Sequence, residues 1–138
     1  MKHVFLIDPP ESLHTQKDTS FALMLEAQRQ GHEVHVMLRG AISRFPSGIV
    51  FKTRKAVVED RVENAFALQD WQENAAENFD IVWIRTDPPF DVHYLTDTWL
   101  LSQIKGRPLV VNAPHGLRTI NEKIWAAQFT EITPPTLI

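Results

Sequence analysis

The residues best suited to bind a ligand lie around a Pro-Pro turn in the middle of the chain. Arg85, Asp87 and Asp91 occur close together, and Pro88 and Pro89 fix two backbone φ angles among them. An arginine at the end of a strand can hold a carboxylate through two parallel N–H···O bonds. Two alternatives stay open: Arg85 binds a ligand carboxylate, or it pairs with Asp87 or Asp91 and only stabilises the turn.

A second polar group lies near the amino terminus. Asp8 follows an apolar run, while Lys17 and Asp18 precede a segment with helical periodicity. Asp18 is placed to accept the free N–H groups of a first helical turn, which is the common role of such a residue. Lys17 can hold a carboxylate or extend into solvent. Neither group supplies a nucleophile or a general base.

The sequence lacks the motifs of several classes of enzyme. There are no cysteines, so thiolate metal sites and cysteine nucleophiles are excluded, and the six histidines form no HExxH pair. No GxSxG elbow and no glycine-rich phosphate loop is present, because the first apolar run leads into Asp8-Pro9-Pro10. We therefore predict no catalytic residues and no metal ligands in this chain.

Charge and hydropathy argue against nucleic-acid and membrane partners. The net charge is −3 and the pI about 6.0, and the one basic cluster, Lys52, Arg54 and Lys55, has the alternation of a solvated strand face. The apolar run Val4–Ile7 is too short for a signal peptide. No segment approaches the ~20 apolar residues that span a bilayer. A cytoplasmic location is the simplest expectation.

The remaining periodicities predict an open α/β sheet. Short apolar runs typical of buried strands occupy residues 4–7, 33–38, 81–84 and 109–111. Helical spacing predicts three helices: from Asp18 or Thr19 to just before Gly31, from Tyr94 to near Gly106, and from Thr119 to Phe129. In such sheets ligands bind outside the carboxyl ends of the strands. Polar loops follow residues 7, 84 and 111, so we expect the site at this edge.

Residues 41–79 are harder to interpret. Ile49–Phe51 and Ala56–Val58 are predicted to be two paired strands around the basic cluster, and residues 62–71 fit either a helix or an extended segment. Pro134-Pro135 indicates a linker or a domain boundary.

Three segments resemble one known family. Three motifs are similar, in sequence and in order, to motifs of bacterial glutathione synthetases. The first is the helix signature KDTSFALMLEAQRQG at residues 17–31, and the second is the loop RTDPPFD at 85–91. The third is VNxP at 111–114, followed by LR at 117–118 and NEK at 121–123. The resemblance covers nearly the whole chain and is weakest between residues 41 and 79. It implies a small three-layer Rossmann-like fold, the pre-ATP-grasp domain, with an open, mostly parallel sheet over residues 1–133. Residues 134–138 would then begin the linker to an ATP-grasp domain.

The resemblance also implies a reaction. This family joins γ-glutamylcysteine to glycine with ATP and Mg²⁺, through an acyl phosphate on the cysteinyl carboxylate, and its members tend to form homo-oligomers. The nucleotide and the metal would be held by the ATP-grasp region, so this chain alone is expected to be inactive and to hold neither.

Roles carry over at matching positions only. Arg85, Asp87, Asp18 and Ser20 resemble residues that line the peptide-substrate cleft, and Lys123 resembles the lysine that reaches the nucleotide. Thr86 departs from the family pattern, since some relatives carry a basic residue there. Two alternatives remain: a free-standing, non-catalytic module that binds a small molecule or a protein, and the N-terminal domain of another ATP-grasp peptide ligase.

Overall fold

The computed structural model describes residues 1–120 and 124–135. The strands of this part are β1 (Lys2–Leu6), β2 (Glu33–Met37), β3 (Ile42–Phe45), β4 (Gly48–Val58), β5 (Phe66–Leu68), β6 (Gln72–Ala75), β7 (Ile81–Ile84) and β8 (Leu109–Val111). The α-helices are α1 (Thr19–Arg29), α2 (Val92–Leu101) and α3 (Pro114–Thr119), and short 3₁₀ helices are η1 (Pro10–Ser12), η2 (Ala76–Asn78) and η3 (Ala126–Gln128).

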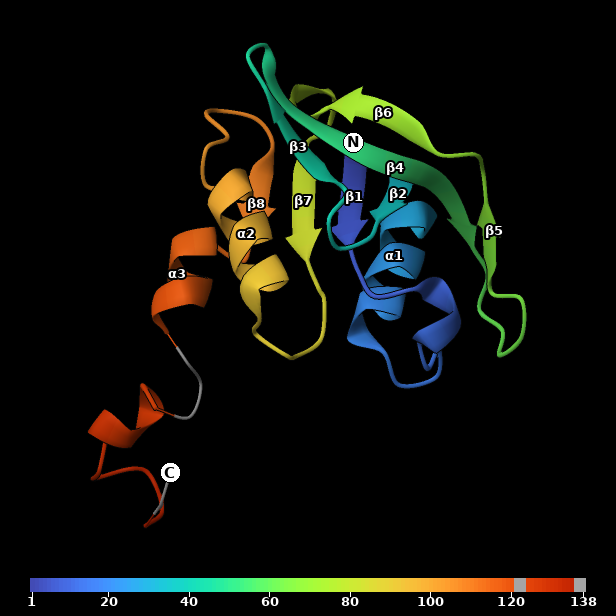
Figure 1. Cartoon of the computed structure of the whole chain (residues 1–138). Helices are drawn as coiled ribbons and strands as arrows, with labels where there is room; N and C mark the ends of the chain where they lie inside the picture. The colour runs from blue at the N-terminus through green and yellow to red at the C-terminus, as the bar shows by residue number, and fades with distance from the viewer. Residues whose placement is uncertain (121–123, 136–138) are drawn as a thin grey trace.

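The strands form one open sheet in the order β3-β4-β2-β1-β7-β8. Its centre, β2-β1-β7-β8, is parallel, and each of these strands is followed by a polar loop at the same edge. β4 extends the sheet in the antiparallel sense, pairing with β2 and β3 along one side and with β5 and β6 along the other. Figure 1 shows β4 curling across the end of the parallel strands. The predicted α/β class is confirmed.

Helices cover both faces of the parallel centre, which gives three layers. Successive side chains of a strand point to opposite faces, and in β1 Val4 and Leu6 join a core with Leu101 of α2. Phe5 instead joins a second core with Phe21 of α1. Burying a side chain such as Phe21 contributes roughly 2–3 kcal/mol. The helices α1 and α2 therefore hold the sheet between them (Figure 1).

The first two helices begin at aspartates. Asp18 accepts a hydrogen bond from the N–H of Phe21 at 2.9 Å, and Asp91 accepts one from Tyr94 at 2.9 Å. Each bond satisfies one of the free N–H groups of a first helical turn. The bond to Asp18 confirms the predicted start of α1. After α1 the chain turns at Gly31, whose φ of 75° favours glycine.

Three expectations were wrong in detail. The second helix, expected to end near Gly106, ends at Leu101. Residues 48–58 form one long strand, β4, rather than two strands paired with each other, because β4 finds partners on both sides. Residues 66–68 are a strand, which decides the open choice in favour of an extended segment. The final helix was placed too late: α3 ends at Thr119, and η3 is a single turn. Pro114 supplies a preset φ for a first helical turn, so the helix begins where we expected only a turn.

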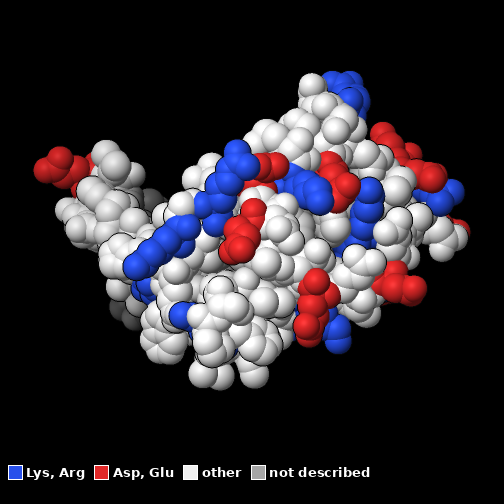
Figure 2. Space-filling view, turned by 90° about the horizontal axis from the view of Figure 1, so that it is seen from above, with Lys and Arg blue, Asp and Glu red and all other residues white. Residues whose placement is uncertain are grey.

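The basic cluster lies on β4, as predicted. Lys52 and Arg54 both lie over the ring of Trp71, at 5.9 and 5.3 Å from its centroid. Lys55 forms an ion pair with Glu33 at 2.9 Å. On the face seen in Figure 2, basic and acidic side chains are interleaved. The cations of this cluster thus already have partners within the chain.

Candidate functional site

The candidate site lies at the edge where β1 and β7 end. The two strands are parallel neighbours, with Leu6 opposite Ile84, so the segments that follow them emerge together (Figure 1). The N–H of Arg85 donates to the carbonyl of Leu6 at 2.8 Å, which continues the ladder by one residue. Asp8 and the loop of residues 85–91 are thereby brought to one edge, as the sequence predicted.

Arg85 is attached to the start of α1. Its Nε donates to Ser20 Oγ at 3.1 Å, and the Ser20 side chain is buried. Asp18 caps the same first turn and so fixes the position of Ser20. Within the described residues, the two Nη groups of Arg85 make no hydrogen bond. The structure thus brings Arg85, Ser20 and Asp18 together and leaves the outer part of the guanidinium group available.

The internal ion pair considered for Arg85 belongs to a different arginine. Arg39, just after β2, forms ion pairs with Asp8 at 3.5 Å and with Asp91 at 3.7 Å. Its Nη atoms also donate to the carbonyl oxygens of Pro89, at 3.4 Å, and of Asp87. Arg39 therefore stabilises the Pro-Pro loop, a role that we had considered for Arg85.

Sequence reasoning missed Arg39, although a signal was present. The same rule that drew attention to loops after residues 7, 84 and 111 applies to residues 38–40, which follow a parallel strand. Figure 1 shows β2 running in the same direction beside β1. The loop after β2 therefore belongs to the same edge of the sheet as the loops after β1, β7 and β8.

Asp8 and Asp87 interact through the backbone of the loop. The N–H of Asp87 donates to Asp8 Oδ2 at 2.7 Å, while Asp8 Oδ1 faces Arg39. The Asp87 side chain is exposed, and its carboxylate has no hydrogen bond or ion pair within the described residues. Lys17 is exposed as well. Asp8 is thus a structural anchor, whereas the Asp87 carboxylate is free to meet a ligand.

A cleft adjoins the loop on the side of α3. It has a volume of about 480 Å³ and is lined by Thr86, Pro88, Phe90, Tyr94, Leu117, Arg118 and Ile120. Burial raises the pKa of the Tyr94 hydroxyl, against the influence of the nearby Arg39 and Arg85 cations. Arg118 donates to the carbonyl of Thr98 at 2.8 Å and is held against α2. The cleft therefore combines an apolar wall with the hydroxyl group of Tyr94 and one cation, Arg118.

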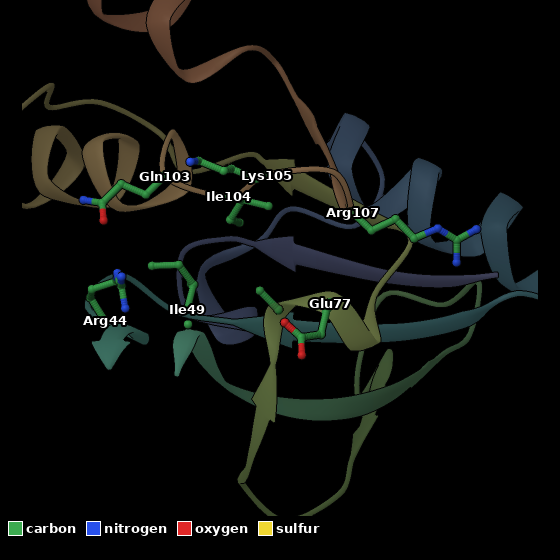
Figure 3. A pocket seen from close by; sticks show the side chains of 9 residues that line it. Arg44, Ile49, Glu77, Gln103, Ile104, Lys105 and Arg107 are labelled. Atoms are coloured by element: carbon green, nitrogen blue, oxygen red, sulfur yellow. The ribbon is translucent and has the colours of Figure 1, made fainter. Parts of the chain in front are cut away.

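A second cavity lies at the opposite edge, where β7 and β8 begin (Figure 3). Its volume is about 340 Å³, and Arg44, Gln103 and Lys105 surround an apolar floor. Arg107 also lines this cavity, and it pairs with Asp80 at 3.1 Å. The predicted site residues in the described part of the chain do not line it.

Two further properties concern metals and membranes. Across residues 1–120 and 124–135, no group of three or more His, Asp or Glu side chains is arranged to hold a metal ion. In the same residues no helix has the length and apolar character needed to cross a bilayer.

Lys123, the predicted nucleotide-binding residue, lies outside the described residues.

The comparison with protein families agrees with the three sequence motifs. The family model described as the prokaryotic glutathione synthetase N-terminal domain matches residues 1–118. The chain belongs to this family. Arg85, Asp87, Asp18 and Ser20 all lie within the matched residues of the glutathione synthetase N-terminal domain, and Lys123 lies beyond them.

Whole-protein relatives carry the same family name. The chain is 38% identical over 134 residues to a glutathione synthetase of Yersinia pestis, 37% to one of Photorhabdus laumondii subsp. laumondii, and 35% to that of Escherichia coli (strain K12). Each alignment covers 96% of this chain but 42% of the relative. The chain thus spans less than half the length of the glutathione synthetases that it matches.

Proposed function

We propose that this chain is the substrate-side domain of a glutathione synthetase, an ATP-dependent carbon–nitrogen ligase that joins γ-glutamylcysteine to glycine through an acyl phosphate. In this proposal Arg85 binds a carboxylate of the peptide substrate at the carboxyl edge of the sheet. The observation that carries it is the state of Arg85: Ser20 occupies Nε, and both Nη groups are free within the described residues. Such a fork fits a carboxylate with two parallel hydrogen bonds.

The other predicted substrate residues have different tasks in this proposal. Asp87 presents an exposed carboxylate beside Arg85, and it suits the ammonium group of a γ-glutamyl moiety. Ser20 is buried and orients Arg85. Asp18 is engaged in capping α1, and it positions Ser20. A cation and an anion held side by side in this way match the zwitterionic end of the peptide.

ATP and Mg²⁺ are assigned to the remainder of the protein. The described residues offer no arrangement of carboxylates for a metal ion, so we derive no step through either group on this chain. In the proposal residues 1–133 form the substrate-side domain and residues 134–138 lead toward an ATP-grasp region, without which no ligation occurs. A cytoplasmic, homo-oligomeric enzyme is the corresponding proposal for the whole protein.

A chimera tests the proposed function. This chain replaces the aligned region of the Escherichia coli (strain K12) enzyme, and ATP-dependent joining of γ-glutamylcysteine and glycine is measured. We expect glutathione to form, and we expect the unfused chain to form none. A chimera that melts cooperatively and binds ATP but forms no glutathione would contradict the proposal. Ligation of another acceptor would favour a different peptide ligase, and tight γ-glutamylcysteine binding by the unfused chain would favour a free-standing module.

A further inference from the structure

Arg39 makes a set of contacts that all lead to one loop. Its guanidinium group reaches the carboxylates of Asp8 and Asp91, the backbone carbonyls of Asp87 and Pro89, and the ring of Tyr94, whose centroid lies 5.9 Å away. The Arg39 side chain is only 21% exposed. Prolines 88 and 89 donate no N–H, so the loop has few backbone bonds of its own. Arg39 supplies bonds that the loop cannot make by itself.

A buried carboxylate lies on α2. Asp97 is 4% exposed, and its Oδ2 is buried without a hydrogen-bond partner among the described residues. Burial raises the pKa of Asp97, and the Arg39 cation opposes this effect.

Arg39 lies on the tight turn between β2 and β3. The N–H of Ala41 donates to the carbonyl of Leu38 at 3.1 Å, and Gly40 has a φ of 76°. Through Arg39 this turn is linked to the Pro-Pro loop and, at Asp91 and Tyr94, to the start of α2.

We propose that Arg39 is a positioning residue that fixes the Pro-Pro loop and thus the directions of Arg85 and Asp87 toward the peptide substrate. The inference rests on the proposed function for its substrate, but the fixing of the loop is a property of this chain alone. Arg39 does not belong to the three sequence motifs of the family resemblance. It is therefore an additional determinant of the site.

The first test measures the loop in the 138-residue chain. Backbone order parameters are measured by NMR relaxation for Thr86, Asp87, Phe90 and Asp91 in the parent and in Arg39→Met. We expect values of about 0.85 in the parent to fall below about 0.6 in the variant. Amides of β1 should keep their values, since a general loss of packing would affect the core as well. Unchanged loop values in a folded Arg39→Met chain would overturn the proposal.

The second test uses the ligating chimera. Arg39→Met should raise KM for γ-glutamylcysteine about tenfold and leave KM for ATP unchanged, and Arg39→Lys should recover only part of the loss because lysine has no planar fork. Arg29→Met is the matched control, because Arg29 is 77% exposed and, among the described residues, pairs only with Glu26. An unchanged KM for γ-glutamylcysteine in an active Arg39→Met chimera overturns the positioning role and leaves the proposed function intact. If the parent chimera is inactive, the order parameters still decide the positioning role.

Discussion

Arg85 Nε lies 3.1 Å from Ser20 Oγ, and this one bond joins the end of β7 to the first turn of α1 across 65 positions of sequence. It decides how the guanidinium group can act. With Nε engaged by a buried serine, the rotation of the group is restricted, and its two Nη groups make no hydrogen bond within the described residues. A fixed donor pair loses less conformational entropy on binding a carboxylate than a mobile one does.

Ser20→Ala should therefore affect the substrate more than the fold. Removing the acceptor leaves Arg85 Nε without its partner, and we expect a loss of about 1 kcal/mol in the free energy of unfolding. In the ligating chimera KM for γ-glutamylcysteine should rise several-fold while KM for ATP stays constant. Ser43→Ala, at an exposed position of β3, is the control. Equal behaviour of the two variants would show that the Ser20 bond has no influence on Arg85.

Asp18 should act through its hydrogen bond to Phe21 N–H. Asp18→Ala removes the cap of α1 and should lower the free energy of unfolding by about 1 kcal/mol, measured by urea denaturation. Asp18→Asn keeps an acceptor oxygen and should cost only a few tenths of that. If asparagine were as destabilising as alanine, the negative charge of Asp18 at the start of α1 would matter rather than its hydrogen bond to Phe21.

Glu33 should control stability in acid. Hydrogen bonds from His35 and then Lys55 lower the pKa of Glu33 from 4.5 to about 2. Because the folded pKa is depressed, this stabilisation is fully present above pH 4.5 and is lost as the pH falls toward 2. We expect a contribution on the order of 1–2 kcal/mol, since the side chain is partly exposed.

Unfolding curves between pH 2 and 6 check this prediction for Glu33→Gln. The difference from the parent should shrink steadily as the pH falls. Glu63→Gln is the control, because Glu63 is exposed and makes no ion pair within the described residues. A Glu33→Gln curve parallel to that of the parent throughout would show that these hydrogen bonds do not stabilise the fold.

The sequence predicted local features of the fold well. β7 and β8 occupy the residues expected for them, because short branched-aliphatic runs bounded by polar residues allow few other structures. The start of α1 at Asp18 followed from capping chemistry. The length and pairing of β4 could not be predicted from the sequence, because tertiary packing on both sides of a strand decides which strands pair with it.

The candidate site was predicted only in part, for a similar reason. Arg85, Asp87 and Asp18 lie in recognisable motifs near strand and helix ends, so their placement at one edge followed from the parallel sheet. Arg39 acts on Pro89 across 50 positions and on Asp87 across 48, and no local pattern marks such contacts. The burial of Asp97 was hidden as well, because a single aspartate in a helix is normally exposed.

The most direct test of the substrate-side assignment is the steady-state kinetics of Arg85 variants in the ligating chimera. Arg85→Met should raise KM for γ-glutamylcysteine at least tenfold, with KM for ATP unchanged, and Arg85→Lys should recover only part of the loss because it offers a single ammonium group. That result would place a substrate carboxylate on Arg85. If both variants ligate with the parental KM for γ-glutamylcysteine, Arg85 does not hold the substrate, and the site proposed at the carboxyl edge of the sheet is wrong.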